Sequence, residues 1–173
     1  HYADVIIIDP YPGNRDYATY TADRTVDAVE GIGYSRPVIH LLQGINFASV
    51  RPDANQLHSM IYQAYMGGSQ YIGYYGFGGA GELEHSEDLW PVITDYYDSG
   101  AYDIMNAQYG SGKEAFVARS REEDAWYDLW EANGVYYAAV QNRTHENNTV
   151  TIALDAEIAS VELVNSVAEA ETA

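Results

Sequence analysis

Apolar residues in the first part of the chain alternate between short continuous runs and segments with helical spacing. The runs at 4–8, 36–43 and 70–75 are almost entirely apolar, which is typical of strands buried on both faces. Helical spacing follows the first run at 22–31, and it follows the second run after Asp53. This alternation predicts β/α units and a parallel sheet.

The segment after Asp53 has the clearest helical pattern in the chain. Its apolar side chains recur every three or four residues, and the glycine pair at 67–68 ends the pattern. Another helix is expected from Asp88 through Tyr97, with Asp88 as its N-cap. The apolar face of the first of these helices consists of Leu57, Met60, Ile61, Ala64 and Tyr65.

From residue 111 onwards the spacing changes from helical to alternating, which predicts short strands. Asn133 and Gly134 form a type I′ hairpin signal between two of these strands. We therefore expect a small antiparallel β-sandwich at 111–173, after a first domain at 1–110. The expected strands are 114–119, 124–130, 135–141 and 149–154, with a fifth around Val161, Leu163 and Val167.

Composition and charge exclude several classes of function. The 173 residues include 26 acidic and 8 basic side chains, and the formal net charge is −18. This negative charge repels the phosphate groups of nucleic acids and the headgroups of anionic lipids, and we therefore expect no nucleic-acid partner.

No apolar run has the length of a membrane span, so we expect no membrane insertion. The chain has no cysteine, which excludes disulfides and thiolate metal sites, and we expect neither a metal nor a cofactor.

Seven of the eight basic residues are arginine, and Lys113 is the only lysine. An acidic, lysine-poor surface suits concentrated salt, which screens its charges, and this favours a halophilic origin. The alternative is an acidic extracellular protein from an ordinary organism. Sequons at Asn142 and Asn147 favour an extracellular or cell-surface location and predict glycosylation there. The start of the chain at a strand, without a leader, predicts a fragment or a processed product.

The residues that follow the three apolar runs could form a binding site, because the carboxyl ends of parallel strands meet at one edge. They are Asp9 and Tyr11, then Gln43 and Asn46, then Tyr75. Carboxylates and amides bind vicinal hydroxyl groups, and aromatic rings stack on the C–H faces of sugars. Asp9 also precedes a proline, so an alternative role for its side chain is to cap a turn.

Three segments, read in order, resemble strands six, seven and eight of a glycoside-hydrolase (β/α)8 barrel. They are the D-x-x-x-x-D-x-Y-P pattern at 4–12, the R-P-V sequence opening the run at 36–43, and the tyrosine-rich run at 71–75. In such barrels a small β-sandwich often follows the last helix. The resemblance implies the last three β/α units of a TIM-type barrel, incomplete in this chain, plus a C-terminal antiparallel β-sandwich. Missing sequence or another chain would supply the remaining strands.

The resemblance implies hydrolysis of glycosidic bonds in an oligo- or polysaccharide. In retaining barrels of this kind, strand seven ends in the glutamate nucleophile. The matching position here is Gln43, whose amide cannot form a glycosyl ester. Asp9 is therefore the candidate catalytic residue, and Tyr11, Gln43, Asn46 and Tyr75 are candidates for substrate binding. The alternative is a non-catalytic carbohydrate-binding or surface structural protein that keeps the barrel, so enzyme activity stays open.

Other interpretations of these residues also stay open. The three apolar runs could instead form a small open α/β sheet in a complete domain, although its edges would be exposed. His40 lies within a strand and is expected to be a core histidine. Trp126 and Trp130 are expected to pack against the first domain, and the alternative is an exposed face that binds carbohydrate.

Overall fold

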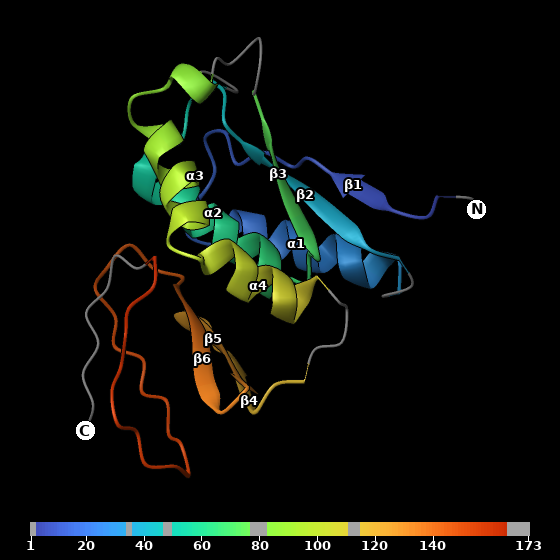
Figure 1. The fold of residues 1–173 in the computed structure, drawn as a ribbon. Helices are drawn as coiled ribbons and strands as arrows, with labels where there is room; N and C mark the ends of the chain where they lie inside the picture. The colour runs from blue at the N-terminus through green and yellow to red at the C-terminus, as the bar shows by residue number, and fades with distance from the viewer. Residues whose placement is uncertain (1–2, 34–35, 47–49, 77–82, 111–114, 166–173) are drawn as a thin grey trace.

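The computed structural model of the chain describes residues 3–33, 36–46, 50–76, 83–110 and 115–165. Strands and helices alternate in its first half, two further helices follow, and three antiparallel strands come last (Figure 1). No helix within these ranges is both long enough and apolar enough to cross a membrane.

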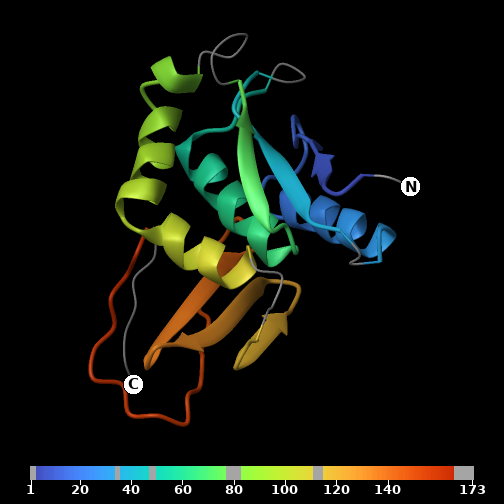
Figure 2. The same ribbon diagram turned by 45° about the vertical axis from the view of Figure 1, so that its right-hand side comes forward.

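The first sheet is parallel, as the sequence predicts. Its strands, in order across the sheet, are β1 (Ile6–Ile8), β2 (Val38–Gln43) and β3 (Tyr71–Tyr75). Ile8 pairs with His40, and Gln43 pairs with Tyr75. The three carboxyl ends therefore lie at the same edge of the sheet (Figure 2).

Two helices pack on one face of the parallel sheet. They are α1 (Tyr20–Gly31) and α2 (Ala54–Met66). A capping box fixes the start of α2, because the Gln56 N–H donates to the Asp53 carboxylate and the Asp53 N–H donates to the Gln56 side chain, both at 2.8 Å. The predicted helix after Asp53 is therefore confirmed.

After β3, a 3₁₀ turn η1 (Leu83–His85) leads into α3 (Leu89–Asp98) and α4 (Ala101–Tyr109). Helix α3 is the helix expected up to Tyr97. Asp88 precedes α3 but does not cap it with its side chain, because its carboxylate pairs with Arg51 at 2.5 Å. The sequence pattern did not predict α4, which begins after Gly100 in the left-handed conformation (φ 80°).

The apolar face of α2 forms the centre of the hydrophobic core. These side chains are completely buried, and the leucine, isoleucine and methionine among them each contribute about 1.5–3 kcal/mol when removed from water. They are the residues that the helical spacing predicts, namely Leu57, Met60, Ile61, Ala64 and Tyr65.

His40 lies on β2, buried beneath α1. Its Nδ1 atom lies 2.7 Å from the Thr25 hydroxyl, which donates to the Thr21 carbonyl at 2.8 Å. Burial lowers the pKa of His40 to about 4, because the charged imidazolium loses its hydration. His40 is therefore the core histidine that its position in a strand predicts.

The second sheet is an antiparallel meander. Its strands are β4 (Ala118–Arg121), β5 (Ala125–Ala132) and β6 (Val135–Asn142). Between β5 and β6, Asn133 and Gly134 both have positive φ angles, 55° and 79°, as a type I′ turn requires. The predicted hairpin is confirmed.

The predicted fold class, three units of a TIM-type barrel followed by a β-sandwich, is wrong. Within the described residues the parallel sheet is open, with β1 and β3 as its edges, whereas a barrel requires a sheet that closes on itself. The antiparallel sheet is a single layer, because residues 149–154 and the residues around Val161 form no strand. The alternating pattern there predicts strands, but among the described residues no second sheet packs against the antiparallel sheet, as a β-sandwich would require. Val167 lies outside the described residues. The expected domain boundary falls at their edge, because residue 110 is described and residue 111 is not.

A buried carboxylate joins α4 to the antiparallel sheet. Asp128 on β5 is fully buried, and it accepts a hydrogen bond from the Tyr109 hydroxyl at 2.5 Å. Two partly exposed guanidinium groups pair with the same carboxylate, Arg119 at 2.8 Å and Arg121 at 2.7 Å. Burial, and then the negative charge of Asp128, raise the pKa of Tyr109 well above its usual value.

Trp126 and Trp130 are both buried in packing contacts. Trp130 stacks on Tyr137 with ring centroids 5.7 Å apart. The guanidinium groups of Arg121 and Arg143 lie over the ring of Trp126, at 4.8 and 4.0 Å from its centroid. Trp130 also meets the ring of Tyr109 on α4 edge-on, with centroids 6.1 Å apart, so it packs against the first part of the chain as expected. Both guanidinium groups over Trp126 belong to the second part, so the expected packing of Trp126 against the first part stays a prediction.

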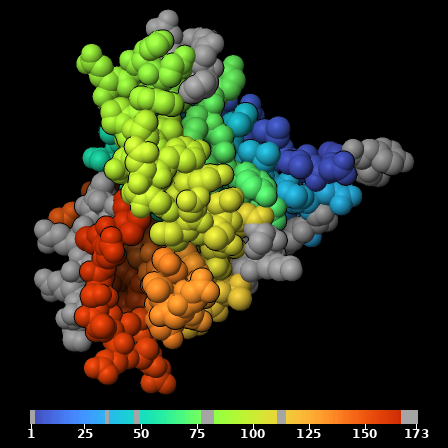
Figure 3. All heavy atoms as spheres, viewed as in Figure 1, coloured from blue at the N-terminus to red at the C-terminus, as the bar shows by residue number. Residues whose placement is uncertain are grey.

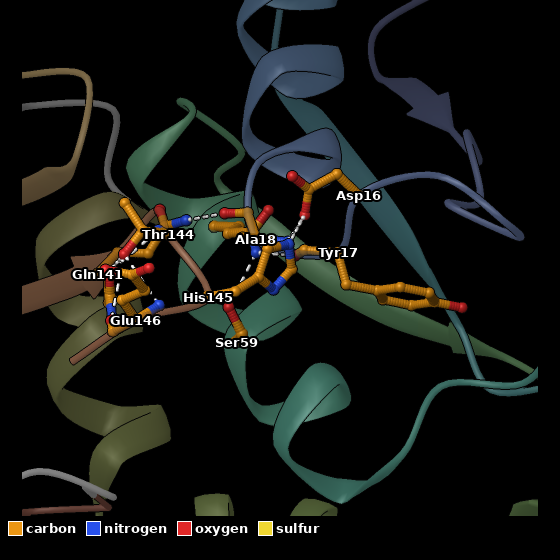
Figure 4. Close-up of polar contacts among 10 residues, drawn as sticks. Asp16, Tyr17, Ala18, Ser59, Gln141, Thr144, His145 and Glu146 are labelled. Atoms are coloured by element: carbon orange, nitrogen blue, oxygen red, sulfur yellow. Dashed lines mark hydrogen bonds and ion pairs between the residues drawn. The ribbon is translucent and has the colours of Figure 1, made fainter.

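Polar contacts connect the end of β6 to the start of α1 (Figure 4). The Gln141 side chain donates to the Ala18 carbonyl at 2.9 Å. His145 lies 3.1 Å from the Asp16 carboxylate, which also accepts the Ala18 N–H at 2.8 Å. The antiparallel sheet is thus held against the β/α part of the chain.

Residues 150–165 have no strand or helix and run along the outside of the molecule (Figure 3). Asn165 fixes this segment to the helices. Its carbonyl accepts from His58 Nε2 at 2.8 Å, and its side chain accepts from the Tyr62 hydroxyl at 2.7 Å and donates to Asp95. A cleft of about 300 Å³ lies beside these contacts.

Replacing Asp128 with Asn tests the buried carboxylate. The change leaves two arginines without their counter-charge, so we expect the free energy of unfolding to fall by about 3 kcal/mol in urea titrations. Asp27→Asn is the control, because it removes an exposed pair with Arg24 at 2.8 Å and should cost less than about 1 kcal/mol. Similar losses in both variants would contradict a special role for Asp128.

Stability should also depend on pH through His40. Its pKa in the folded protein is about 4 against a usual value of 6.5, so the unfolded chain binds the proton more readily. Stability is therefore complete above pH 6.5 and decreases as the pH falls towards 4, by roughly 2.5 kcal/mol at pH 4.5. His40→Leu should be less sensitive over this range in urea titrations. Parallel pH profiles for both proteins would show that His40 is not responsible.

Candidate functional site

The five site residues predicted from the sequence lie at the carboxyl edge of the parallel sheet. We call this set the rim: Asp9, Tyr11, Gln43, Asn46 and Tyr75. The parallel order of β1, β2 and β3 brings their ends together there. The rim lies at the end of the β/α part that faces away from the antiparallel sheet (Figure 1).

Two tyrosines form the aromatic part of the rim. The ring centroids of Tyr11 and Tyr75 are 5.5 Å apart, and the ring planes are tilted by 44°. Tyr75 is 44% exposed. Burial raises the pKa of Tyr11 to about 12, and the nearby charges of Asp9 and Tyr75 add to the effect. Tyr11 is therefore a neutral phenol beside a carboxylate at physiological pH.

Glycines allow the ends of β2 and β3 to approach each other closely. A Cβ atom on Gly44 would lie 2.6 Å from the Tyr75 carbonyl, which accepts the Gly44 N–H at 3.1 Å. Gly76 has a φ angle of 107°, and a Cβ atom there would lie 2.4 Å from Ile45. Only glycine fits at these two positions, so the backbone fixes where Tyr75 sits.

Gln43 is completely buried, and the chain itself uses both ends of its amide. Its Oε1 atom accepts from the Gly13 N–H at 3.0 Å and from the Tyr17 hydroxyl at 3.4 Å. Its Nε2 atom donates to the carbonyls of Ile45 and Val50, at 2.9 and 2.8 Å. Gln43 therefore joins the loop after β1 to the loop after β2 and positions the rim. The sequence analysis singled out Gln43 but missed Tyr17 and Gly13.

Asp9 and Asn46 are both exposed at the rim. Asp9 supplies a carboxylate close enough to Tyr11 to affect its pKa. Among the rim residues Asp9 is the only carboxylate, so hydrolysis by a pair of carboxyl groups would need a second one from elsewhere. Within the described residues, no three His, Cys, Asp or Glu side chains gather in a way that could hold a metal ion.

The two predicted glycosylation residues lie in different surroundings beyond β5. The side chain of Asn142, at the end of β6, donates to the Glu146 carbonyl at 2.7 Å and accepts from the Thr144 N–H at 3.0 Å. Asn147 is exposed in the loop that follows. Both side chains are exposed, and glycosylation stays a prediction for both.

A search of protein-family models found no match to this sequence, and searches of curated proteins and of solved structures found none either. The function of the rim must therefore be inferred from its own residues.

Gln43→Glu tests the positioning role of the amide. A carboxylate there would face the carbonyl oxygens of Ile45 and Val50, so we expect about 3 kcal/mol less stability at neutral pH in urea titrations. Burial against these carbonyls raises the carboxyl pKa above its unfolded value of about 4.3, so the loss should shrink in acid, where the group is protonated.

Gln56→Glu is the matched control for this change. Gln56 belongs to the capping box at the start of α2, where glutamate is equally suitable. The free energy of unfolding of the Gln56→Glu variant should stay within about 0.5 kcal/mol of that of the original protein. If Gln43→Glu is equally mild at neutral pH, the amide does not hold the two loops together.

Proposed function

We propose that the rim binds a neutral oligo- or polysaccharide and does not cleave it. The observation that carries this proposal is the pair of tilted tyrosine rings, 5.5 Å apart, beside the exposed Asp9. The exposed part of Tyr75 can stack on the C–H face of a sugar ring. The carboxylate of Asp9 can accept hydrogen bonds from neighbouring hydroxyl groups, and the amide of Asn46 can both donate and accept.

The charge of the molecule favours a neutral ligand over an anionic one. With a formal net charge of −18, the protein repels uronates, sulfated glycans and phosphorylated sugars at long range. A neutral saccharide meets no such barrier. Its hydroxyl groups can exchange hydrogen bonds with water for hydrogen bonds with the carboxylate, while the aromatic contact supplies the apolar burial.

Binding without cleavage fits the rim better than hydrolysis. Glycosidases usually need an acid and a second carboxylate on either side of the bond. Of the rim residues, Asp9 alone supplies a carboxylate, and the amide at the expected nucleophile position is occupied by four hydrogen bonds within the chain. Gln43 then supports the site without touching the sugar.

Replacing Tyr75 with Ala tests saccharide binding. Calorimetric titration with a panel of neutral oligosaccharides should give a measurable affinity for the original protein. We expect Tyr75→Ala to weaken it about tenfold, because the aromatic surface is lost. Tyr136→Ala is the matched control, since Tyr136 is 39% exposed on β6 in the other sheet and should leave affinity unchanged. Equal losses in both variants, or no binding by the original protein, would contradict the proposal.

The same panel separates binding from hydrolysis. When the protein is incubated with each oligosaccharide, we expect no reducing sugar to be released from the oligosaccharide. Release that Asp9→Asn abolishes would show instead that Asp9 is catalytic, and the binding function would then be part of an enzyme.

A further inference from the structure

Strand β1 is an edge of the parallel sheet, and no strand among the described residues pairs with its outer side. Ile6 pairs with Val38, and its N–H donates to the Pro37 carbonyl at 2.9 Å. In a parallel pair, alternate residues direct both backbone groups to the same neighbour. Ile6 and Ile8 therefore face β2, and Ile7 directs its N–H and C=O away from the sheet. The side chain of Ile7 is 62% exposed, and β1 lies at the periphery of the molecule (Figure 3).

A groove of about 480 Å³ runs between this edge and helix α1. Its apolar lining comes from both elements, and charged side chains stand among the apolar ones. The groove is therefore able to take the side chains of a strand laid along β1. Its lining residues are Ile7, Ile8, Asp9, Pro10, Arg24, Asp27 and Ala28.

The charges in the groove favour a cationic occupant. The guanidinium group of Arg24 is paired with Asp27 at 2.8 Å and lies 5.7 Å from the ring centroid of Tyr20. The carboxylate of Asp9 is exposed, so the groove has one negative charge in excess. The net charge of −18 extends the attraction for a basic partner beyond the groove itself.

We propose that β1 binds an extended, basic segment of another protein as an added strand. The backbone of the segment bonds the N–H and C=O of Ile7, its apolar side chains enter the groove, and its lysines or arginines reach Asp9 and Asp27. A second copy of this chain is a poorer occupant, because it would bring a groove of the same negative charge. A saccharide would not pair with the N–H and C=O of Ile7 in the way that an added strand does.

A synthetic peptide of alternating valine and lysine, about eight residues long, is the probe. A peptide of alternating proline and lysine has the same charge but cannot pair as a strand, and it is the matched control. We expect the valine peptide to bind about tenfold more tightly in calorimetric titrations. In NMR experiments it should also slow the hydrogen exchange of the Ile7 amide, which no purely electrostatic contact would do.

Asp27→Lys should weaken binding of the valine peptide about tenfold or more, because it reverses a charge in the groove. Asp98→Lys makes the same change of net charge at the end of α3, on an exposed residue, and should have a smaller effect. Equal affinity for the two peptides, unchanged exchange at Ile7, or equal effects of the two variants would overturn the proposal. Dimers in sedimentation velocity, with the Ile7 amide protected before any peptide is added, would instead assign the edge to a second copy.

Discussion

The packing of helix α2 between the two sheets is the contact on which the rest of the structure depends. This helix touches β2 and β3 on one side and β5 and β6 on the other, with α1 and α3 beside it. Its buried Gln63 accepts the Ala22 N–H at 3.1 Å and donates to the Tyr17 carbonyl at 2.6 Å. Tyr17 in turn donates to Gln43. The position of the rim therefore depends on a helix that contributes no residue to it, through side-chain hydrogen bonds that are buried and cannot be exchanged for water without cost.

Much of the β/α part of the fold could be predicted from the sequence, because its elements carry strong local signals. The stripe on α2 and the glycine pair after it are local patterns, and so is the turn at Asn133 and Gly134. The number of strands in a sheet is not local. It depends on which segments pair with each other. Residues 149–154 have the alternating pattern of a strand, but they form no strand. The expectation of a barrel failed for the same reason, since three parallel strands have the same pattern in an open sheet as in a closed one.

The candidate site was predictable in its location and less so in the roles of its residues. Strand direction alone places Asp9, Tyr11 and Tyr75 at one edge, because parallel strands share their exits. The role of Gln43 depends on groups that sequence patterns do not reveal, namely the backbone N–H of Gly13 and the backbone carbonyl of Val50. With the same neighbouring residues in sequence, an amide at the end of a strand can either contact a ligand or hold a loop in place. Only the distances to those backbone atoms distinguish the two roles.

The scarcity of lysine has an explanation within the fold as well as in the solvent. Arg119, Arg121 and Arg143 each pair with a carboxylate, and each also lies over an aromatic ring. A planar guanidinium group makes both contacts at once, whereas an ammonium group is a compact charge that makes the second one less well. Concentrated salt screens exposed ion pairs over a few ångströms, but it weakens the pairs made by the buried carboxylate of Asp128 far less. Arg119 and Arg121, which pair with Asp128, would therefore be favoured at any salt concentration, and the halophilic origin predicted from the composition rests on the excess of acidic residues.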